Sequence, residues 1–461
     1  MKINSSIKPD RKGRFWDNAS WQEQYKLKTV TAKEAAAQVN NGDFVFTCGG
    51  LNYPIDFMEE LCKVVKENNY HIDLYSTYSI YPNAPHMQPD VKDNIDVYAM
   101  FLGQERKVQD LGNLRYCPCW MSDVGRLIRQ HKPRVGAFVV SPPNEDGWMS
   151  RSIWTHHYAK EAYLNDSCEV LVVEVNENMP FLWSDGPSEQ HTFIHVSEVD
   201  YIVESHYQMI EIKAPPASET DKIIAGHIAE LVPDGACLQI GLGGLADAVT
   251  SLLSSAGKKD LGLWSELITN GLYDLIAAGI LTNAAKNFFP GKSVVATCVG
   301  DRRLWDWATN NPDCLILEGP YVNDIRNIAR NDRVTSINNC LDVDLQGQIS
   351  SEAMGFRQYS GTGGQLEFVI AAQFSKGGKS ILCLESTYTD KQGNLVSKIK
   401  PTLDIGSPVT VPRTIVQWVV TEYGAVNLRN KSLRERAKAL ISIAHPQFRD
   451  ELTAYAAKLP W

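Results

Sequence analysis

The 461-residue sequence lacks the patterns that would indicate a metal centre or a disulfide framework. Of its ten cysteines only Cys117 and Cys119 lie close together, and no CxxC pair or cysteine–histidine cluster has zinc spacing. We therefore expect free, mostly buried thiols in a reducing cytoplasm, and we expect no metal site.

Long hydrophobic runs and an excess of positive charge are missing as well. No stretch approaches the roughly 18 consecutive apolar residues of a membrane span, and the polar start, residues 1–6, lacks the apolar segment of a signal peptide. The net charge is −9, whereas non-specific nucleic-acid binding requires a basic face. We expect a cytoplasmic protein with no nucleic-acid or membrane partner. An anionic small ligand is still compatible with this charge, because a helix N-terminus can bind one.

Short apolar strands alternate with helices along most of the chain. Length alone fits roughly two to four domains. Near-continuous apolar runs predict buried strands at 44–48, 134–140 and 169–175, with helical segments between them. Segments 334–339 and 341–349 are predicted to form an adjacent pair of strands. The alternation predicts an α/β fold of mainly parallel sheets with flanking helices.

A proline-containing linker divides the chain into two related halves. Pro215 and Pro216 disfavour both helix and central strand, so we place an N-terminal domain at 1–214 and a C-terminal domain at 215–461. The order helix, turn, strand, glycine pair, helix near the start of the chain returns after the linker. This recurrence predicts two open α/β domains of similar topology.

One glutamate follows a predicted strand of the second half. The segment Leu261–Leu267 reads as a strand that leads to Glu266. Ligands of open α/β sheets bind beyond the carboxyl ends of the strands, so Glu266 is a candidate catalytic carboxylate. The alternative is a glutamate that caps a loop or pairs with a lysine. The corresponding strand of the first half, 71–75, has no such carboxylate.

The glycine loop that precedes this strand fits more than one function. Gly241, Gly243 and Ala246 match GxGxxA, and Glu266 lies 20 residues beyond Ala246, as in a dinucleotide-binding unit. The glycines also suit a simple tight turn, or a cradle for the pyrophosphate of an acyl-coenzyme A. In that last case Glu266 would attack the acyl thioester, and a second glycine loop, Ser360–Gln365, would supply oxyanion-stabilising N–H groups or serve only as a turn.

Five longer segments are far more specific than either loop. They comprise residues 173–180, 194–201, 239–244, 351–365 and 421–428. Through them the chain resembles, from about Gly42 to Leu433, the acetyl-CoA hydrolase/transferase family of class I CoA-transferases. The resemblance is strongest to 4-hydroxybutyrate and butyryl-CoA:acetate CoA-transferases, and it outweighs the dinucleotide interpretation.

The resemblance implies a ping-pong transfer of coenzyme A between an acyl-CoA and small carboxylates such as acetate, butyrate or 4-hydroxybutyrate. Glu266 matches the family's catalytic glutamate, which carries a glutamyl-CoA thioester. Coenzyme A is then a substrate and a transient covalent adduct, with no prosthetic group, and a homodimer or homotetramer is expected. The implied coenzyme A contacts are Gly241, Leu242, Gly243, Gly244, Leu245, Asn338, Gly363 and Gly364.

Four alternatives stay open at this point. They are an acyl-CoA hydrolase that uses the same glutamate, a transferase for dicarboxylates such as succinate or itaconate, an NAD-dependent dehydrogenase, and a non-catalytic coenzyme A sensor. The chain also departs from the family at Trp264, where a histidine often stands. An apolar wall at that position predicts an altered acyl preference, and desolvation by Trp264 would raise the pKa of Glu266 if the two side chains pack together.

Overall fold

The computed structural model describes residues 19–151, 153–154, 168–184 and 192–461, so the polar start of the chain lies outside the described residues. Two compact units are present, one formed by 1–211 with 296–321 and the other by 212–295 with 322–461. Contacts thus assign 296–321 to the first unit, and the domain boundary after residue 214 stays a prediction. In the part of the chain that the structure describes, no helix has the length and apolar character needed to cross a membrane.

The first unit is built on a seven-stranded sheet in which all strands are parallel. Helix α3 (Ile55–Glu67) packs its apolar side, including Phe57 and Leu61, into a core with Val45 and Val135 of the sheet. In order across the sheet, the strands are β4 (Leu114–Tyr116), β3 (Ile95–Ala99), β2 (Ile72–Tyr75), β1 (Phe44–Thr47), β5 (Val135–Val140), β7 (Val170–Asn176) and β9 (Tyr201–Ser205).

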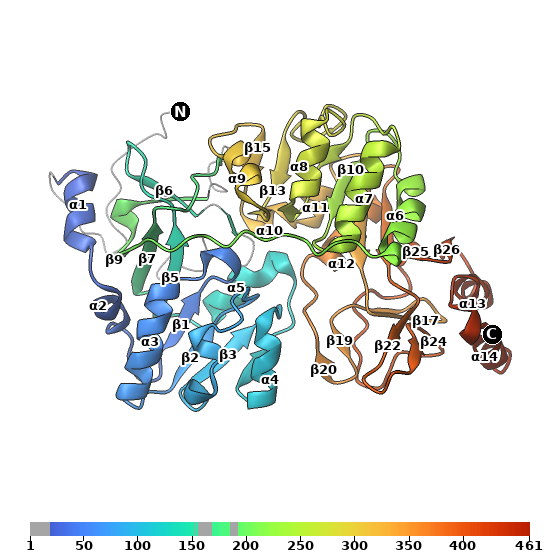
Figure 1. Ribbon diagram of the computed structural model, residues 1–461, viewed down its shortest axis with the longest axis horizontal. Helices are drawn as coiled ribbons and strands as arrows, with labels where there is room; N and C mark the ends of the chain where they lie inside the picture. Colours follow the sequence, from blue (N-terminus) through green and yellow to red (C-terminus); the bar gives the residue numbers. More distant parts are fainter. Residues whose placement is uncertain (1–18, 152, 155–167, 185–191) are drawn as a thin grey trace. The chain divides into compact units, whose positions relative to one another are not determined.

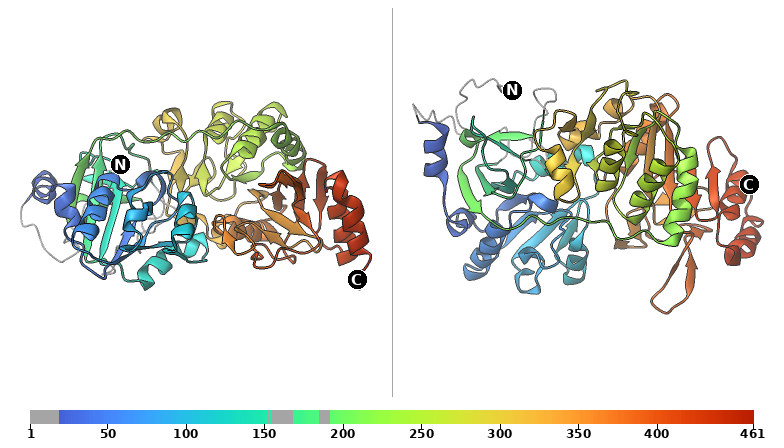
Figure 2. Two further views of the ribbon diagram at one scale, coloured as in Figure 1. Left: turned by 60° about the horizontal axis from the view of Figure 1, so that its bottom comes forward. Right: turned by 45° about the horizontal axis from the view of Figure 1, so that its top comes forward.

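The second unit has a six-stranded sheet that is parallel except for its last strand. Helices α6 (Glu219–Leu231), α7 (Gly244–Ser255) and α8 (Asn270–Ala277) lie side by side in this unit (Figures 1 and 2). Across the sheet the strands are β11 (Gly262–Leu263), β10 (Cys237–Ile240), β16 (Val334–Asn339), β21 (Lys379–Cys383), β25 (Trp418–Thr421) and β26 (Gly424–Asn427).

The two units share one strand order. In the first unit β2, β1, β5, β7 and β9 are neighbours in that order, and in the second β11, β10, β16, β21 and β25 follow the same scheme. In each sheet the strand order reverses beside the first strand of that half. The reversal lies between β1 and β5 in the first unit and between β10 and β16 in the second. The predicted α/β class, with mainly parallel sheets and two similar halves, is therefore confirmed.

One predicted pairing is wrong. Strand β16 belongs to the main sheet, where it pairs with β10 and β21. Strand β17 (Asp342–Asp344) instead pairs with β18 (Ile349–Ser350) and β24 (Ile399–Lys400) in a separate small sheet. The two segments are adjacent in sequence, but β16 lies within the main sheet. Both of its edges are already paired, with β10 and β21, so β17 cannot pair with it there.

Capping residues define where the second unit's first helix begins. Ser218 accepts a hydrogen bond from the Asp221 backbone N–H at 3.0 Å, and the Asp221 carboxylate accepts one from the Ser218 N–H at 2.9 Å. Such a capping box satisfies two backbone donors that a helix start otherwise leaves unpaired. The chain that precedes it is extended, as its prolines predict.

Candidate active site

Glu266 lies just beyond the carboxyl end of β11, in the short loop before β12 (Leu267–Ile268). The backbone here is held in place because the Trp264 N–H donates to Leu238 O and the Ser265 N–H donates to Val294 O, each at 3.1 Å. Strand β11 is next to β10, and the strand order reverses between β10 and β16. Glu266 therefore occupies the edge of the sheet at which open α/β folds bind their ligands.

The Glu266 carboxylate receives two hydrogen bonds from uncharged donors. Asn323 Nδ2 lies 3.1 Å from Glu266 Oε2, and the Gly364 backbone N–H is the second donor. Burial raises the pKa of Glu266 to about 7, although both hydrogen bonds act in the opposite direction because they favour the ionised form. Desolvation outweighs the two donors, so this carboxylate is more basic than an ordinary glutamate.

Gly364 can contact the carboxylate only because it has no side chain. A Cβ atom at this position would overlap Glu266 Oε2 and Asn323 Nδ2. Its φ of −90° is open to any residue, so the requirement for glycine is one of space. Gly364 is also the N-cap of α12 (Gln365–Phe374), whose N-terminal dipole favours negative charge on Glu266. The predicted second glycine loop thus leads into a helix, and Gly364 reaches the predicted catalytic residue.

Asn323 is the site residue that the sequence did not reveal. It is fully buried and lies 57 residues from Glu266 in the chain, just before the short helix α11 (Ile325–Ile328). Its Nδ2 also donates to Glu367 Oε2 at 3.1 Å. No sequence signal marks it, because neither a strand end nor a glycine motif adjoins it.

Asn338, predicted as a coenzyme A contact, has its side chain directed to other partners. Its amide forms a reciprocal pair with Gln239 across β16 and β10, with Nδ2 and Oδ1 at 2.9 and 3.0 Å from the opposite amide. Asn338 Nδ2 is also 2.9 Å from Ser336 Oγ. The pair joins the two strands between which the order reverses. Gln239 lies two residues before Gly241, at which the first glycine loop begins. The role of Asn338 in coenzyme A binding stays a prediction.

The first glycine loop connects β10 to α7 and leaves space above its backbone. A Cβ atom on Gly241 or Gly243 would meet nothing within 4 Å, and Gly243 has φ +131°, a conformation that residues with side chains rarely adopt. No side chain caps α7, which begins at Gly244. Leu245 is buried and anchors the first turn. The free N-terminal amides and the helix dipole suit a phosphate group.

The Trp264 side chain is buried in the protein interior and is not exposed to solvent. Its indole stacks on Phe288 with ring centroids 5.1 Å apart, and Lys286 Nζ lies 5.4 Å from the ring centroid. Its Nε1–H donates to Val322 O at 2.8 Å. Because Val322 directly precedes Asn323, this bond supports the backbone that presents Asn323 to Glu266. That Trp264 desolvates Glu266 or alters acyl preference stays a hypothesis.

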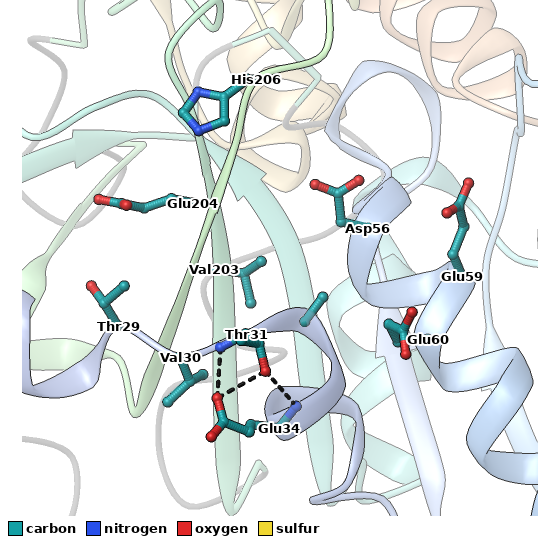
Figure 3. A pocket seen from close by; sticks show the side chains of 11 residues that line it. Thr29, Val30, Thr31, Glu34, Asp56, Glu59, Glu60, Val203, Glu204 and His206 are labelled. Atoms are coloured by element: carbon teal, nitrogen blue, oxygen red, sulfur yellow. Dashed lines mark hydrogen bonds between the residues drawn. The ribbon is translucent and has the colours of Figure 1, made fainter.

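A cleft in the first unit has the wrong charge for coenzyme A. The cleft lies beside α2 (Ala32–Ala36), α3 and β9. The Glu34 carboxylate in it accepts hydrogen bonds from the backbone N–H and the hydroxyl of Thr31 (Figure 3). Carboxylates dominate its lining and would repel phosphate groups. They belong to Glu34, Asp56, Glu59, Glu60 and Glu204.

One group of possible metal ligands occurs among the described residues. It consists of His71, Asp73 and Asp96 on the first sheet, and Arg115 binds the Asp96 carboxylate at 2.8 Å. The guanidinium already pairs with that carboxylate, and nothing else at this group points to a bound ion, so we assign no metal to it.

Comparison with known proteins identifies the family of the chain. The model of the acetyl-CoA hydrolase/transferase N-terminal domain matches residues 10–212, and that of the C-terminal domain matches residues 300–456. The chain is 38% identical over 435 residues to the 4-hydroxybutyrate coenzyme A transferase of Clostridium kluyveri, which covers 94% of this chain and 98% of that protein. It is 37% identical to the butyryl-CoA:acetate CoA-transferase of Anaerostipes caccae, covering 95% and 98%.

A solved structure shows the same fold. RipA from Yersinia pestis superposes with a TM-score of 0.85 at 33% identity, and the match covers 95% of this chain and 99% of RipA. These matches rule out the dehydrogenase interpretation of the first glycine loop. The chain belongs to the acetyl-CoA hydrolase/transferase family and is an enzyme of the CoA-transferase kind.

Proposed function

We propose that the protein is an acyl-CoA:carboxylate CoA-transferase that works through a covalent glutamyl-CoA thioester on Glu266. The observation that carries the proposal is the Glu266 carboxylate itself, a half-buried and unusually basic group held by two neutral donors. Two similar relatives are named for 4-hydroxybutyrate and for butyryl-CoA with acetate. Short-chain monocarboxylates are accordingly the proposed substrates, ahead of dicarboxylates.

The first half-reaction is a double displacement. A Glu266 oxygen attacks the acyl carbonyl carbon, the C–S bond breaks, and a mixed anhydride and the coenzyme A thiolate result. The thiolate then attacks the Glu266 carbonyl carbon, the C–O bond of the anhydride breaks, and the free carboxylate of the donor leaves. The enzyme keeps coenzyme A as a thioester, and no net proton is transferred.

Asn323 and Gly364 stabilise the charge that develops in these steps. Both donate to the Glu266 carboxylate. When the thiolate attacks, the negative charge of the tetrahedral intermediate returns to a Glu266 oxygen that faces these donors. Fixed donors at a developing oxyanion are usually the largest single contribution to catalysis. The second half-reaction reverses the sequence with the acceptor carboxylate.

The loop from Gly241 to Leu245 is the proposed site for the coenzyme A pyrophosphate. Its open backbone at Gly241 and Gly243 and the uncapped start of α7 support this assignment. We also propose that the enzyme acts in the cytoplasm as a homodimer or homotetramer. The ten cysteines, all free thiols and eight of them buried, are compatible with that reducing compartment.

The decisive experiment traps the covalent intermediate. The enzyme is incubated with butyryl-CoA and no acceptor, digested, and its peptides are weighed by mass spectrometry. We expect a coenzyme A adduct on Glu266 that is absent from Glu266→Ala, although that variant still binds butyryl-CoA. Absence of the adduct with butyryl-, acetyl- and 4-hydroxybutyryl-CoA would refute the mechanism.

Addition of acetate to the trapped enzyme distinguishes CoA-transferase activity from acyl-CoA hydrolase activity. A transferase produces acetyl-CoA, whereas a hydrolase produces free coenzyme A in amounts that do not depend on acetate. We expect acetyl-CoA, because discharge by water requires water to reach a thioester on a side chain that is only partly accessible to it. Binding of butyryl-CoA without either product would instead indicate a sensor.

A further inference from the structure

Asn323 donates from a single nitrogen to two carboxylates. Its Nδ2 lies 3.1 Å from Glu266 Oε2 and 3.1 Å from Glu367 Oε2. Glu367 is fully buried on α12, three residues after Gly364. The mechanism proposed above uses Glu266, Asn323 and Gly364 and gives Glu367 no part.

We propose that Glu367 is a positioning residue that orients the Asn323 amide so that its NH₂ group faces Glu266. Both carboxylate oxygens accept a hydrogen bond from Asn323 Nδ2, and an amide has donors on one side and an acceptor on the other. If the Asn323 amide were turned over, its Oδ1 would face both carboxylates. Glu367 therefore favours the one orientation in which Asn323 serves as a donor to Glu266. This inference rests on the proposed function of Glu266.

The contribution of Glu367 is greatest when Glu266 carries coenzyme A. Glu266 is then a neutral thioester, whose carbonyl oxygen attracts a donor more weakly than a carboxylate does. Glu367 keeps its partner throughout the cycle, because it takes no part in bond formation. The donor is thus already aimed at the Glu266 oxygen when the acceptor carboxylate attacks, and no reorganisation is needed at that moment.

Substitution of Glu367 is expected to lower kcat and leave acyl-CoA binding intact. Glu367→Leu removes the acceptor, and we expect kcat to fall by about 10- to 100-fold, since a misaimed oxyanion donor loses much of its effect. Glu367→Gln keeps a carbonyl oxygen that accepts more weakly, and we expect a loss of about three- to tenfold. The KM for butyryl-CoA stays within about twofold. Gln373→Ala, on the same helix, is the matched control and is expected to keep the wild-type kcat.

A double-mutant cycle with Asn323→Ala separates positioning from a general structural role. If Glu367 acts through Asn323, either Glu367 substitution changes kcat by less than about twofold once Asn323 is alanine. If Glu367 only supports the fold, its effect multiplies with that of Asn323→Ala. The cycle is run with Glu367→Gln, which keeps the volume of the side chain, should Glu367→Leu fail to fold.

The outcomes distinguish this inference from the function on which it rests. Failure of the wild-type enzyme to form the Glu266 adduct overturns both. A wild-type adduct with multiplicative losses in the cycle, or with full kcat in Glu367→Leu, overturns the positioning role alone. A wild-type adduct with no added loss in the Asn323→Ala background supports it.

Discussion

The raised pKa of Glu266 predicts that this carboxylate, the proposed nucleophile, destabilises the folded protein at neutral pH. Burial moves its pKa from the ordinary 4.5 to about 7. The folded state therefore holds this proton more tightly than the unfolded chain does. The corresponding stability is complete below pH 4.5, decreases as the pH rises through 7, and is lost above that. Glu266→Gln, which cannot ionise, should escape the loss.

The size of the effect follows from the two pKa values. Each pKa unit corresponds to about 1.4 kcal/mol, so full ionisation of Glu266 costs the folded state up to about 3 kcal/mol. Between pH 5 and pH 8 most of that change occurs. Since the Glu266 side chain is partly accessible to water, we expect the advantage of Glu266→Gln to be about 2 kcal/mol larger at pH 8 than at pH 5. For a unit of this size, that difference is about 4–8 °C in Tm.

The assay compares the Tm of wild type and Glu266→Gln by calorimetry at both pH values. Other buried acids, such as Glu174 with a pKa raised to about 8 by burial, titrate in both proteins and cancel from the difference. Glu230→Gln, at an exposed position on α6, controls for the loss of one negative charge. The same pKa should appear as the acidic limb of kcat/KM near pH 7. An equal Tm difference at pH 5 and pH 8, together with a limb near 4.5, would refute the reasoning.

Three further substitutions test the geometry around Glu266. Gly364→Ala should lower kcat at least about 100-fold and abolish the peptide adduct, because its methyl group overlaps the carboxylate; Gly226→Ala, in open space on α6, should keep the wild-type rate. Trp264→Phe leaves the buried Val322 carbonyl without its donor, so we expect unfolding to become easier by about 1–3 kcal/mol in denaturant titrations, and kcat to fall. An unchanged kcat would show that the bond from Trp264 to Val322 does not support catalysis. Gly241→Ala should raise the KM for acyl-CoA about tenfold with kcat and Tm unchanged, which steady-state kinetics and calorimetry measure.

The sequence was sufficient for the features that depend on local order. Strand and helix alternation predicted the parallel sheets, and the sequence placed Glu266 just beyond the carboxyl end of a strand, where the structure has it. The glycine at 364 marked a loop whose backbone lies against another group, the Glu266 carboxylate. Each of these inferences needs only a short segment and the general behaviour of α/β sheets.

The remaining site residues depend on tertiary packing that no local pattern encodes. Asn323 reaches Glu266 across 57 residues of chain and lies beside a short helix without a motif. Asn338 stands at the end of a central strand, which made it a reasonable candidate. The parallel register of β10 and β16 nevertheless brings Gln239 opposite Ser336 and gives the Asn338 amide a partner within the sheet. Strand register gives Asn338 another partner, and tertiary packing brings Asn323 to the carboxylate; both are properties of the assembled fold.

The two halves show how one topology yields a single site. Both place glycines after their first central strand, at Gly49 and Gly50 in one unit and at Gly241 and Gly243 in the other. A Cβ atom on Gly49 would collide with the Thr77 backbone, and one on Gly50 with the Trp154 ring, so the first pair is needed for internal packing. The second pair faces open space and is followed by the strand that leads to Glu266. In the first half these contacts fill the space beside the loop, and the next strand, β2, contains Asp73 but has no carboxylate just beyond its end. Under the proposed function, two local differences confine the chemistry to the second half, an open loop and one glutamate, within a strand order that both halves share.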